Sequence, residues 1–261
     1  GAFGIKMHLS PEEVVVSLLA LRLGGPVKWV ERRRENFEAS IHAHEQRLRV
    51  ELAADREGRI LGLRARILSD VGAYSVSPLT AALEPLGAAS SLPGPYDISH
   101  YAYEAFAVAT TKCPAGAYRG VGQVMATFAR ERLVDLLARR LSLDPAEVRR
   151  RNLIPGDRLP YTNPAGLLYD SGDYRACLER ALQLSEYARL RGQVEAERRA
   201  GRRVGIGLAC FVEATAIGCA TYRGRGMREV PGHDAATVRV APSGQVEVLT
   251  RAQRGTRGGA P

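Results

Sequence analysis

The sequence carries a glycine-rich segment near its centre, Cys113-Pro114-Ala115-Gly116-Ala117-Tyr118-Arg119-Gly120-Val121-Gly122-Gln123. The pattern over residues 101–111 predicts a strand that leads into this segment. Directly after it, an apolar stripe opposite arginines and acids predicts a helix, and the stripe contains Met125, Phe128, Leu133, Leu136, Leu137 and Leu141. A strand, a tight glycine loop and a helix in this order direct backbone N–H groups toward a ligand.

The two glycines that follow Arg119 allow two interpretations. An arginine beside small residues suits a phosphate or an oxo anion, because its guanidinium offers several donors in one plane. The full dinucleotide fingerprint G-x-G-x-x-G is absent, however, and a helix start closed by glycines explains the segment better when it stands alone. The rest of the sequence has to separate a binding loop from a plain helix start.

Upstream of this loop, the sequence predicts a helix and a β-hairpin. Residues 10–13 read Ser-Pro-Glu-Glu, a capping box with proline in the first turn, so we expect a helix to about Leu23, ended by the Gly-Gly-Pro that follows. Residues 27–30 predict a short strand. Apolar residues alternate in residues 46–54 and 61–67, which predicts a hairpin with one buried face. Residues 71–95 predict irregular structure or short helices.

Downstream, helices give way to a second hairpin. Residues 144–147, Asp-Pro-Ala-Glu, form another capping box and start a short helix. Residues 155–172 predict a loop, and helices are expected over 173–184 and 189–199, the second with a basic face. A strand is expected over residues 204–212. Residues 236–249 predict a hairpin that turns at Pro242-Ser243-Gly244, and residues 251–261 predict an unstructured end.

Composition limits the class of protein. The chain has 261 residues, of which 45% are hydrophobic and 25% charged, as in an ordinary globular protein. The sequence shows neither an apolar run of the roughly 20 residues that span a bilayer nor a secretory signal, and we expect a cytoplasmic protein. Four cysteines without a C-x-x-C pair, Cys113, Cys177, Cys210 and Cys219, predict reduced thiols. The net charge of +9 comes from scattered arginines and leaves a basic nucleic-acid-binding module as an alternative.

The histidines give a weak indication of a metal site. His42 and His44 would share one face of an extended segment, a spacing compatible with metal ligation, but no third ligand is evident. His8, His100 and His233 are isolated in the sequence. Neither a G-x-S-x-G elbow nor a Cys-His signature supports nucleophilic catalysis.

A series of short segments in one order resembles the molybdenum-binding large subunit of the xanthine dehydrogenase and aldehyde oxidase family. The resemblance covers roughly residues 1–250. The segments are Gly1-Ala2-Phe3-Gly4-Ile5-Lys6, Pro26-Val27-Lys28-Trp29-Val30-Glu31, Arg34-Glu35-Asn36, the loop at 117–123, Glu131-Arg132-Leu133, Asp144-Pro145-Ala146-Glu147, Arg151-Asn152-Leu153-Ile154, Tyr169-Asp170-Ser171-Gly172-Asp173 and Gly205-Ile206-Gly207-Leu208.

The resemblance implies an α+β fold, a molybdopterin-binding domain with mixed sheets and packed helices. It assigns residues 1–203 to most of a first molybdopterin-binding domain and 204–250 to the start of the following one. The cofactor-binding residues that it implies are Phe3, Gly4, Arg119 and Gly120, none of which ligates the metal directly. Met7 and Val121 would line the substrate pocket. Met7 stands where purine-oxidising relatives have Glu, and Val121 stands where many relatives have an aromatic residue.

The resemblance also implies cofactors, partners and a reaction. A molybdenum-molybdopterin, with or without a nucleotide extension (a dinucleotide form), would serve hydroxylation of an aldehyde or a nitrogen heterocycle with water as the oxygen source. FAD and 2Fe-2S clusters would lie on partner subunits or domains, in a complex expected to dimerise. Carbon monoxide dehydrogenases of the family have a copper-binding Cys directly after the loop arginine, where this chain has Gly120. Copper is therefore not expected.

Two departures from the family point to an internal fragment. The family's catalytic Glu, in a Gly-x-Gly-Glu setting, is absent, and residues 251–261 do not reproduce a cofactor-holding loop. We therefore expect the isolated chain to be inactive. A non-catalytic remnant of the same fold stays an alternative.

Overall fold

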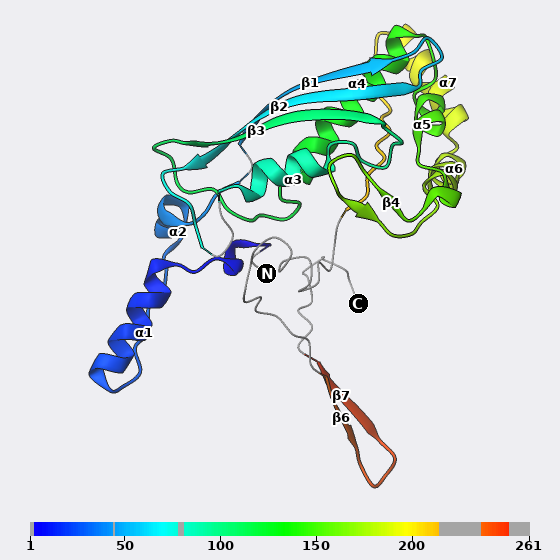
Figure 1. Cartoon of the computed structure of the whole chain (residues 1–261). Helices are drawn as coiled ribbons and strands as arrows, with labels where there is room; N and C mark the ends of the chain where they lie inside the picture. Colours follow the sequence, from blue (N-terminus) through cyan, green and yellow to red (C-terminus); the bar gives the residue numbers. More distant parts are fainter. Residues whose placement is uncertain (1–2, 44, 78–80, 214–235, 251–261) are drawn as a thin grey trace. The chain divides into compact units, whose positions relative to one another are not determined.

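The computed structural model describes residues 3–43, 45–77, 81–213 and 236–250 (Figure 1). The chain divides into two units, one spanning residues 2–212 and the other formed mainly by residues 213–261. Three predictions lie outside the described residues, namely those for His44, for Cys219 and His233, and for the end at 251–261.

The first unit holds most of the secondary structure. Its helices are η1 (Ile5–Met7), α1 (Pro11–Leu23), α2 (Arg33–Ala39), α3 (Leu83–Ser91), α4 (Gln123–Arg140), α5 (Pro145–Asn152), η2 (Gly156–Arg158), α6 (Tyr174–Leu184) and α7 (Tyr187–Arg199). Its strands are β1 (Gln46–Ala54), β2 (Ile60–Gly72), β3 (His100–Ala109), β4 (Tyr161–Thr162) and β5 (Leu168–Tyr169). The second unit contains the hairpin of β6 (Ala236–Val240) and β7 (Val246–Thr250). The α+β class is confirmed.

A three-stranded mixed sheet, in the order β1-β2-β3, organises the first unit (Figure 1). β1 and β2 form the predicted antiparallel hairpin, in which Leu48 faces Ile67. Its turn closes at Gly58, whose positive φ of 84° suits glycine. β3 pairs in parallel with β2, and such a pairing requires a crossover connection, which contains α3.

The core lies between one face of this sheet and helices α3 and α4 (Figure 1). From Leu63 to Val71 every second residue of β2 is buried, including Ala65 and Ile67, while Arg64 and Arg66 point to the exposed face. The strand alternation in the sequence therefore predicted the buried face correctly.

Helix α4 buries a different face from the predicted one. Phe128 and Leu136 of the predicted stripe are exposed, and the buried side chains belong to Ala126, Arg130, Glu131, Val134 and Ala138. The small alanines allow α4 to lie close to α3 and the sheet, whereas the two charged residues are paired with each other. Pairing removes most of the cost that normally keeps such residues at the surface.

Two predicted strands are wrong. Residues 27–30 form no strand, and Trp29 and Val30 are exposed. Residues 204–212 also form no strand. The peptide groups of Leu208 and Cys210 are hydrogen-bonded to side chains from α4 and α5 instead of to a neighbouring strand.

The predicted helix ends are mostly confirmed. Ser10 and Glu13 form the capping box of α1, and Gly24 ends that helix with φ of 66°. Asp144 caps α5 through the amide of Ala146, but the Glu147 carboxylate accepts from Arg150 and Arg151. The hairpin of β6 and β7 turns at Gly244, as expected. Among the described residues, no helix is long and apolar enough to cross a membrane.

Candidate cofactor-binding site

The structure brings the two predicted cofactor loops together. The amide of Arg119 donates a 2.7 Å hydrogen bond to the carbonyl of Phe3. Gly4 lies against the same segment, since a Cβ at Gly4 would stand 2.1 Å from the carbonyl oxygen of Ala117. The rings of Phe3 and Tyr118 have centroids 6.5 Å apart. Segments more than 100 residues apart in the sequence therefore form one surface.

The loop from Arg119 to Gly122 is held in a strained conformation against α3. Gly120, Val121 and Gly122 have φ of 95°, 34° and 76° in succession. A Cβ at Gly122 would stand 2.4 Å from the carbonyl oxygen of Glu84, so only glycine fits there. Phe3 also has a positive φ, 54°, and positive φ is uncommon for residues with a side chain, above all for a β-branched one such as Val121. Backbone strain from such φ values is common at functional sites.

His8 connects the two loops from inside. The residue is 8% exposed, and its Nε2 accepts a 2.8 Å hydrogen bond from the amide of Ala117. Burial lowers the pKa of His8, which keeps the ring neutral, while the Ser77 carbonyl raises that pKa to a smaller extent. A Cβ at Gly116 would stand 2.8 Å from Nε2, so glycine is needed for this approach. Sequence reasoning missed His8 because its partner lies 109 residues away.

The donors of this surface suit an anionic, oxygen-rich cofactor. The Arg119 side chain is exposed and forms no ion pair within the part of the chain that the structure describes. The Gly120 amide next to it donates no hydrogen bond to any described residue, and a side chain at Gly120 would meet Val124 at 2.4 Å. A guanidinium and a bare peptide group beside each other are the groups that bind phosphate and pterin oxygens. The residues present therefore fit a molybdopterin.

The remaining predicted site residues are placed but not assigned a role. Met7 ends η1 and is 49% exposed, and Val121 is partly buried with its carbonyl against Gly87. The ring of His42 contacts the carbonyl of Phe37 at 3.2 Å, and no cluster of metal ligands occurs among the described residues.

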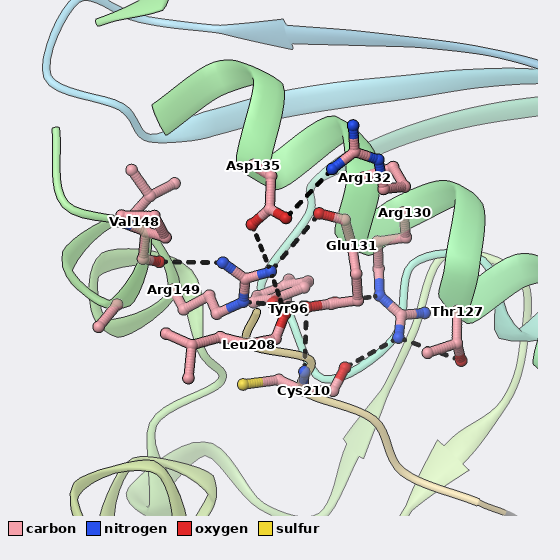
Figure 2. A network of polar contacts seen from close by, with 12 residues as sticks. Tyr96, Thr127, Arg130, Glu131, Arg132, Asp135, Val148, Arg149, Leu208 and Cys210 are labelled. Carbon is pink, nitrogen blue, oxygen red and sulfur yellow. Dashed lines mark hydrogen bonds and ion pairs between the residues drawn. The ribbon is translucent and has the colours of Figure 1, made fainter. Parts of the chain in front are cut away.

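A buried polar network lies in the same unit (Figure 2). The sequence pattern placed the arginines and acids of α4, which contribute to this network, opposite the apolar stripe. The Glu131 carboxylate accepts from the Nε of Arg130 and of Arg149, each at 3.0 Å. It also accepts from the Tyr96 hydroxyl at 3.0 and 3.1 Å and from the Cys210 amide at 3.0 Å. Both guanidiniums are almost fully buried. One carboxylate thus accepts from four donor groups.

The two arginines of this network also bind the segment that was predicted as a strand (Figure 2). Arg149 donates to the Leu208 carbonyl at 2.7 Å, and Arg130 donates to the Cys210 carbonyl at 2.9 Å. Burial, followed by the nearby Glu131 charge, raises the pKa of Cys210 to about 11. The Cys210 thiol is therefore protonated at neutral pH and is no reactive nucleophile.

The segment at residues 151–154, which also carries the family resemblance, has a structural role. The Asn152 side chain accepts from the Ile60 amide at 2.8 Å and donates to the carbonyls of Gly58 and Val148. It fixes the β1–β2 turn on α5. The resemblance was thus carried both by residues of the candidate site and by residues that hold the domain together.

Comparison with known proteins identifies the family of this chain. Residues 1–153 and 180–258 each match a family model described as a molybdopterin cofactor-binding domain. The chain is 43% identical, over 96% of its length, to 30% of the nicotine 6-hydroxylase large subunit of Paenarthrobacter nicotinovorans. It is 36% identical, over 94% of its length, to 31% of the carbon monoxide dehydrogenase large chain of Hydrogenophaga pseudoflava.

A solved structure shares the fold over nearly the whole chain. Quinoline 2-oxidoreductase from Pseudomonas putida 86 superposes with a TM-score of 0.88 at 40% identity, covering 99% of this chain and 33% of that one. The chain therefore belongs to the molybdopterin cofactor-binding domains of the molybdenum-binding subunits in the xanthine dehydrogenase family. It spans about a third of the length of the curated relatives that it matches.

Proposed function

We propose that this chain supplies part of the cofactor cradle in a molybdenum hydroxylase that oxidises a nitrogen heterocycle with water as the oxygen source. The hydrogen bond from the Arg119 amide to the Phe3 carbonyl carries the proposal, because it joins the two loops expected to approach the cofactor. Iron-sulfur and flavin partners, and a dimeric complex, belong to the same proposal. The assignment of residues 1–203 and 204–250 to two successive domains is also proposed.

Two observations support a heterocycle in preference to carbon monoxide. Relatives at 40% identity or above are named for nicotine and quinoline, whereas the carbon monoxide dehydrogenases are 31–36% identical. Gly120 follows Arg119 and has no side chain, so this position offers no thiolate, the soft ligand that Cu(I) prefers.

The residues of this chain would bind and orient. Arg119 and the Gly120 amide would bind oxygen atoms of the cofactor, and the close contact of Gly4 with Ala117 would keep the two loops at a fixed separation. Val121 and Met7 are proposed to shape an aliphatic substrate pocket. The bound molybdenum centre would supply the oxygen-transfer and redox chemistry.

We expect the complete enzyme that carries this chain to hold molybdenum without copper. Elemental analysis, together with turnover of quinoline-type and nicotine-type heterocycles in ¹⁸O-water with a dye acceptor, tests this expectation. Incorporation of the label into a ring hydroxyl agrees with the proposal. Stoichiometric copper accompanied by oxidation of carbon monoxide would overturn it.

Arg119→Ala in the complete enzyme is expected to lower molybdenum content, because it removes a charged donor from the cofactor surface. A lost hydrogen bond to a charged group costs about 1.5–3 kcal/mol, which corresponds to roughly 10- to 100-fold in cofactor affinity. Arg139→Ala, at an exposed position on α4, is the control and should leave the metal content unchanged. Equal metal content in the two variants would remove Arg119 from the site.

A further inference from the structure

His8 is not among the site residues that the family resemblance implies. It directly follows η1, the short helix that begins after Gly4, so it is tied to the first cofactor loop through the chain itself. Its Nε2 accepts from the Ala117 amide, two residues before Arg119 in the second loop. The imidazole therefore joins the two loops by one buried hydrogen bond.

The geometry points to His8 as a positioning residue that sets the second loop relative to the first, so that Arg119 and Gly120 face the cofactor. This inference rests on the proposed function, because it needs the loop to be a cofactor loop. The neighbouring contacts give the hydrogen bond little freedom: the Arg119 amide is bound to Phe3, and Gly116 lies against the ring. A shift of Ala117 would therefore move Arg119 as well.

The chemistry of the contact specifies which side chains can replace histidine. An amide donor at 2.8 Å requires an acceptor at the Nε2 position, and a neutral ring with its proton on Nδ1 provides one. Nδ1 forms no hydrogen bond of good geometry with a described residue, and the Ser77 carbonyl is only a weak acceptor near the ring, so the ring is held mainly through Nε2 and by packing. Glutamine can place its amide oxygen near the Nε2 position, whereas phenylalanine fills the volume without an acceptor.

The test compares His8→Phe and His8→Gln in the complete enzyme, with His100→Phe at an exposed histidine as the matched control. The readouts are hydrogen exchange at the Ala117 amide, molybdenum content, and kcat and KM with quinoline. We expect His8→Phe to speed exchange at Ala117 about tenfold, which corresponds to one net hydrogen bond. Molybdenum content and kcat should fall in the same variant, and His8→Gln should restore all three.

Each other outcome overturns the inference. Equal defects in His8→Phe and His8→Gln would show that the ring acts by packing alone. Unchanged exchange in His8→Phe would show that the hydrogen bond does not hold Ala117. Faster exchange with normal molybdenum content and kcat would show a contact without a positioning role. Failure of the proposed function is distinguishable, because the unmodified enzyme would then lack molybdenum or would not turn over the heterocycle.

Discussion

Glu131→Gln is expected to lower the free energy of unfolding by about 3–5 kcal/mol, the usual cost of removing one partner from a buried ion pair. Both carboxylate oxygens accept from buried donors: Arg130 and Tyr96 bond Oε1, and Arg149, Tyr96 and Cys210 bond Oε2. An amide nitrogen in place of either oxygen would face N–H and O–H groups at about 3 Å. Urea unfolding at equilibrium measures the loss.

The control is the same substitution at a solvated carboxylate. Glu179 pairs with Arg150, and the two side chains are 46% and 31% exposed to solvent. Glu179→Gln should cost less than about 1 kcal/mol, because water screens the pair and replaces its hydrogen bonds. If the two variants unfold at the same urea concentration, the buried network contributes no more than a surface ion pair.

Gly122→Ala is expected to lower stability by about 3 kcal/mol and to reduce molybdenum content in the complete enzyme. The positive φ of Gly122 costs alanine about 1 kcal/mol, and the added Cβ would lie 2.4 Å from the Glu84 oxygen and 2.5 Å from the Ala88 nitrogen. Both contacts are backbone atoms of α3, so relief requires α4 to move away, at a cost of about 1–3 kcal/mol. That movement would displace Arg119.

Gly24→Ala separates conformational cost from steric cost. Gly24 has a φ of 66°, close to that of Gly122, but a Cβ there meets no atom within 4 Å. Thermal and urea unfolding should show a loss of about 1 kcal/mol for Gly24→Ala. A comparable loss in both variants would contradict the close packing of Gly122 on α3.

Much of the fold could be predicted from local patterns. The β1–β2 hairpin, the capped start of α1 and the hairpin of β6 and β7 depend on residues within a few positions of one another, and each is confirmed. The predicted apolar stripe of α4 failed because the buried face contains Arg130 and Glu131, and periodicity assigns charges to solvent. Nothing local in the sequence indicates that a carboxylate on α4 will meet Arg149 on α5.

The candidate site was predictable in part. The resemblance alone assigned Phe3, Gly4, Arg119 and Gly120 to one cofactor, and the structure brings Phe3 into hydrogen-bond contact with Arg119. Their binding of the cofactor stays a prediction. The contribution of His8 depends on a contact between residues 109 positions apart, which neither composition nor spacing reveals. The roles of Met7 and Val121 in a substrate pocket remain predictions.

Arg130, Glu131 and Arg149 hold residues 208–210 by their peptide groups and not by their side chains. Arg149 bonds the Leu208 carbonyl, Arg130 bonds the Cys210 carbonyl, and Glu131 bonds the Cys210 amide. Every amino acid except proline offers the same carbonyl and amide at position 210. Mutational scanning should therefore find that residues 208–210 tolerate substitution, whereas Arg130, Glu131 and Arg149 do not. The path of this segment is determined by side chains of α4 and α5.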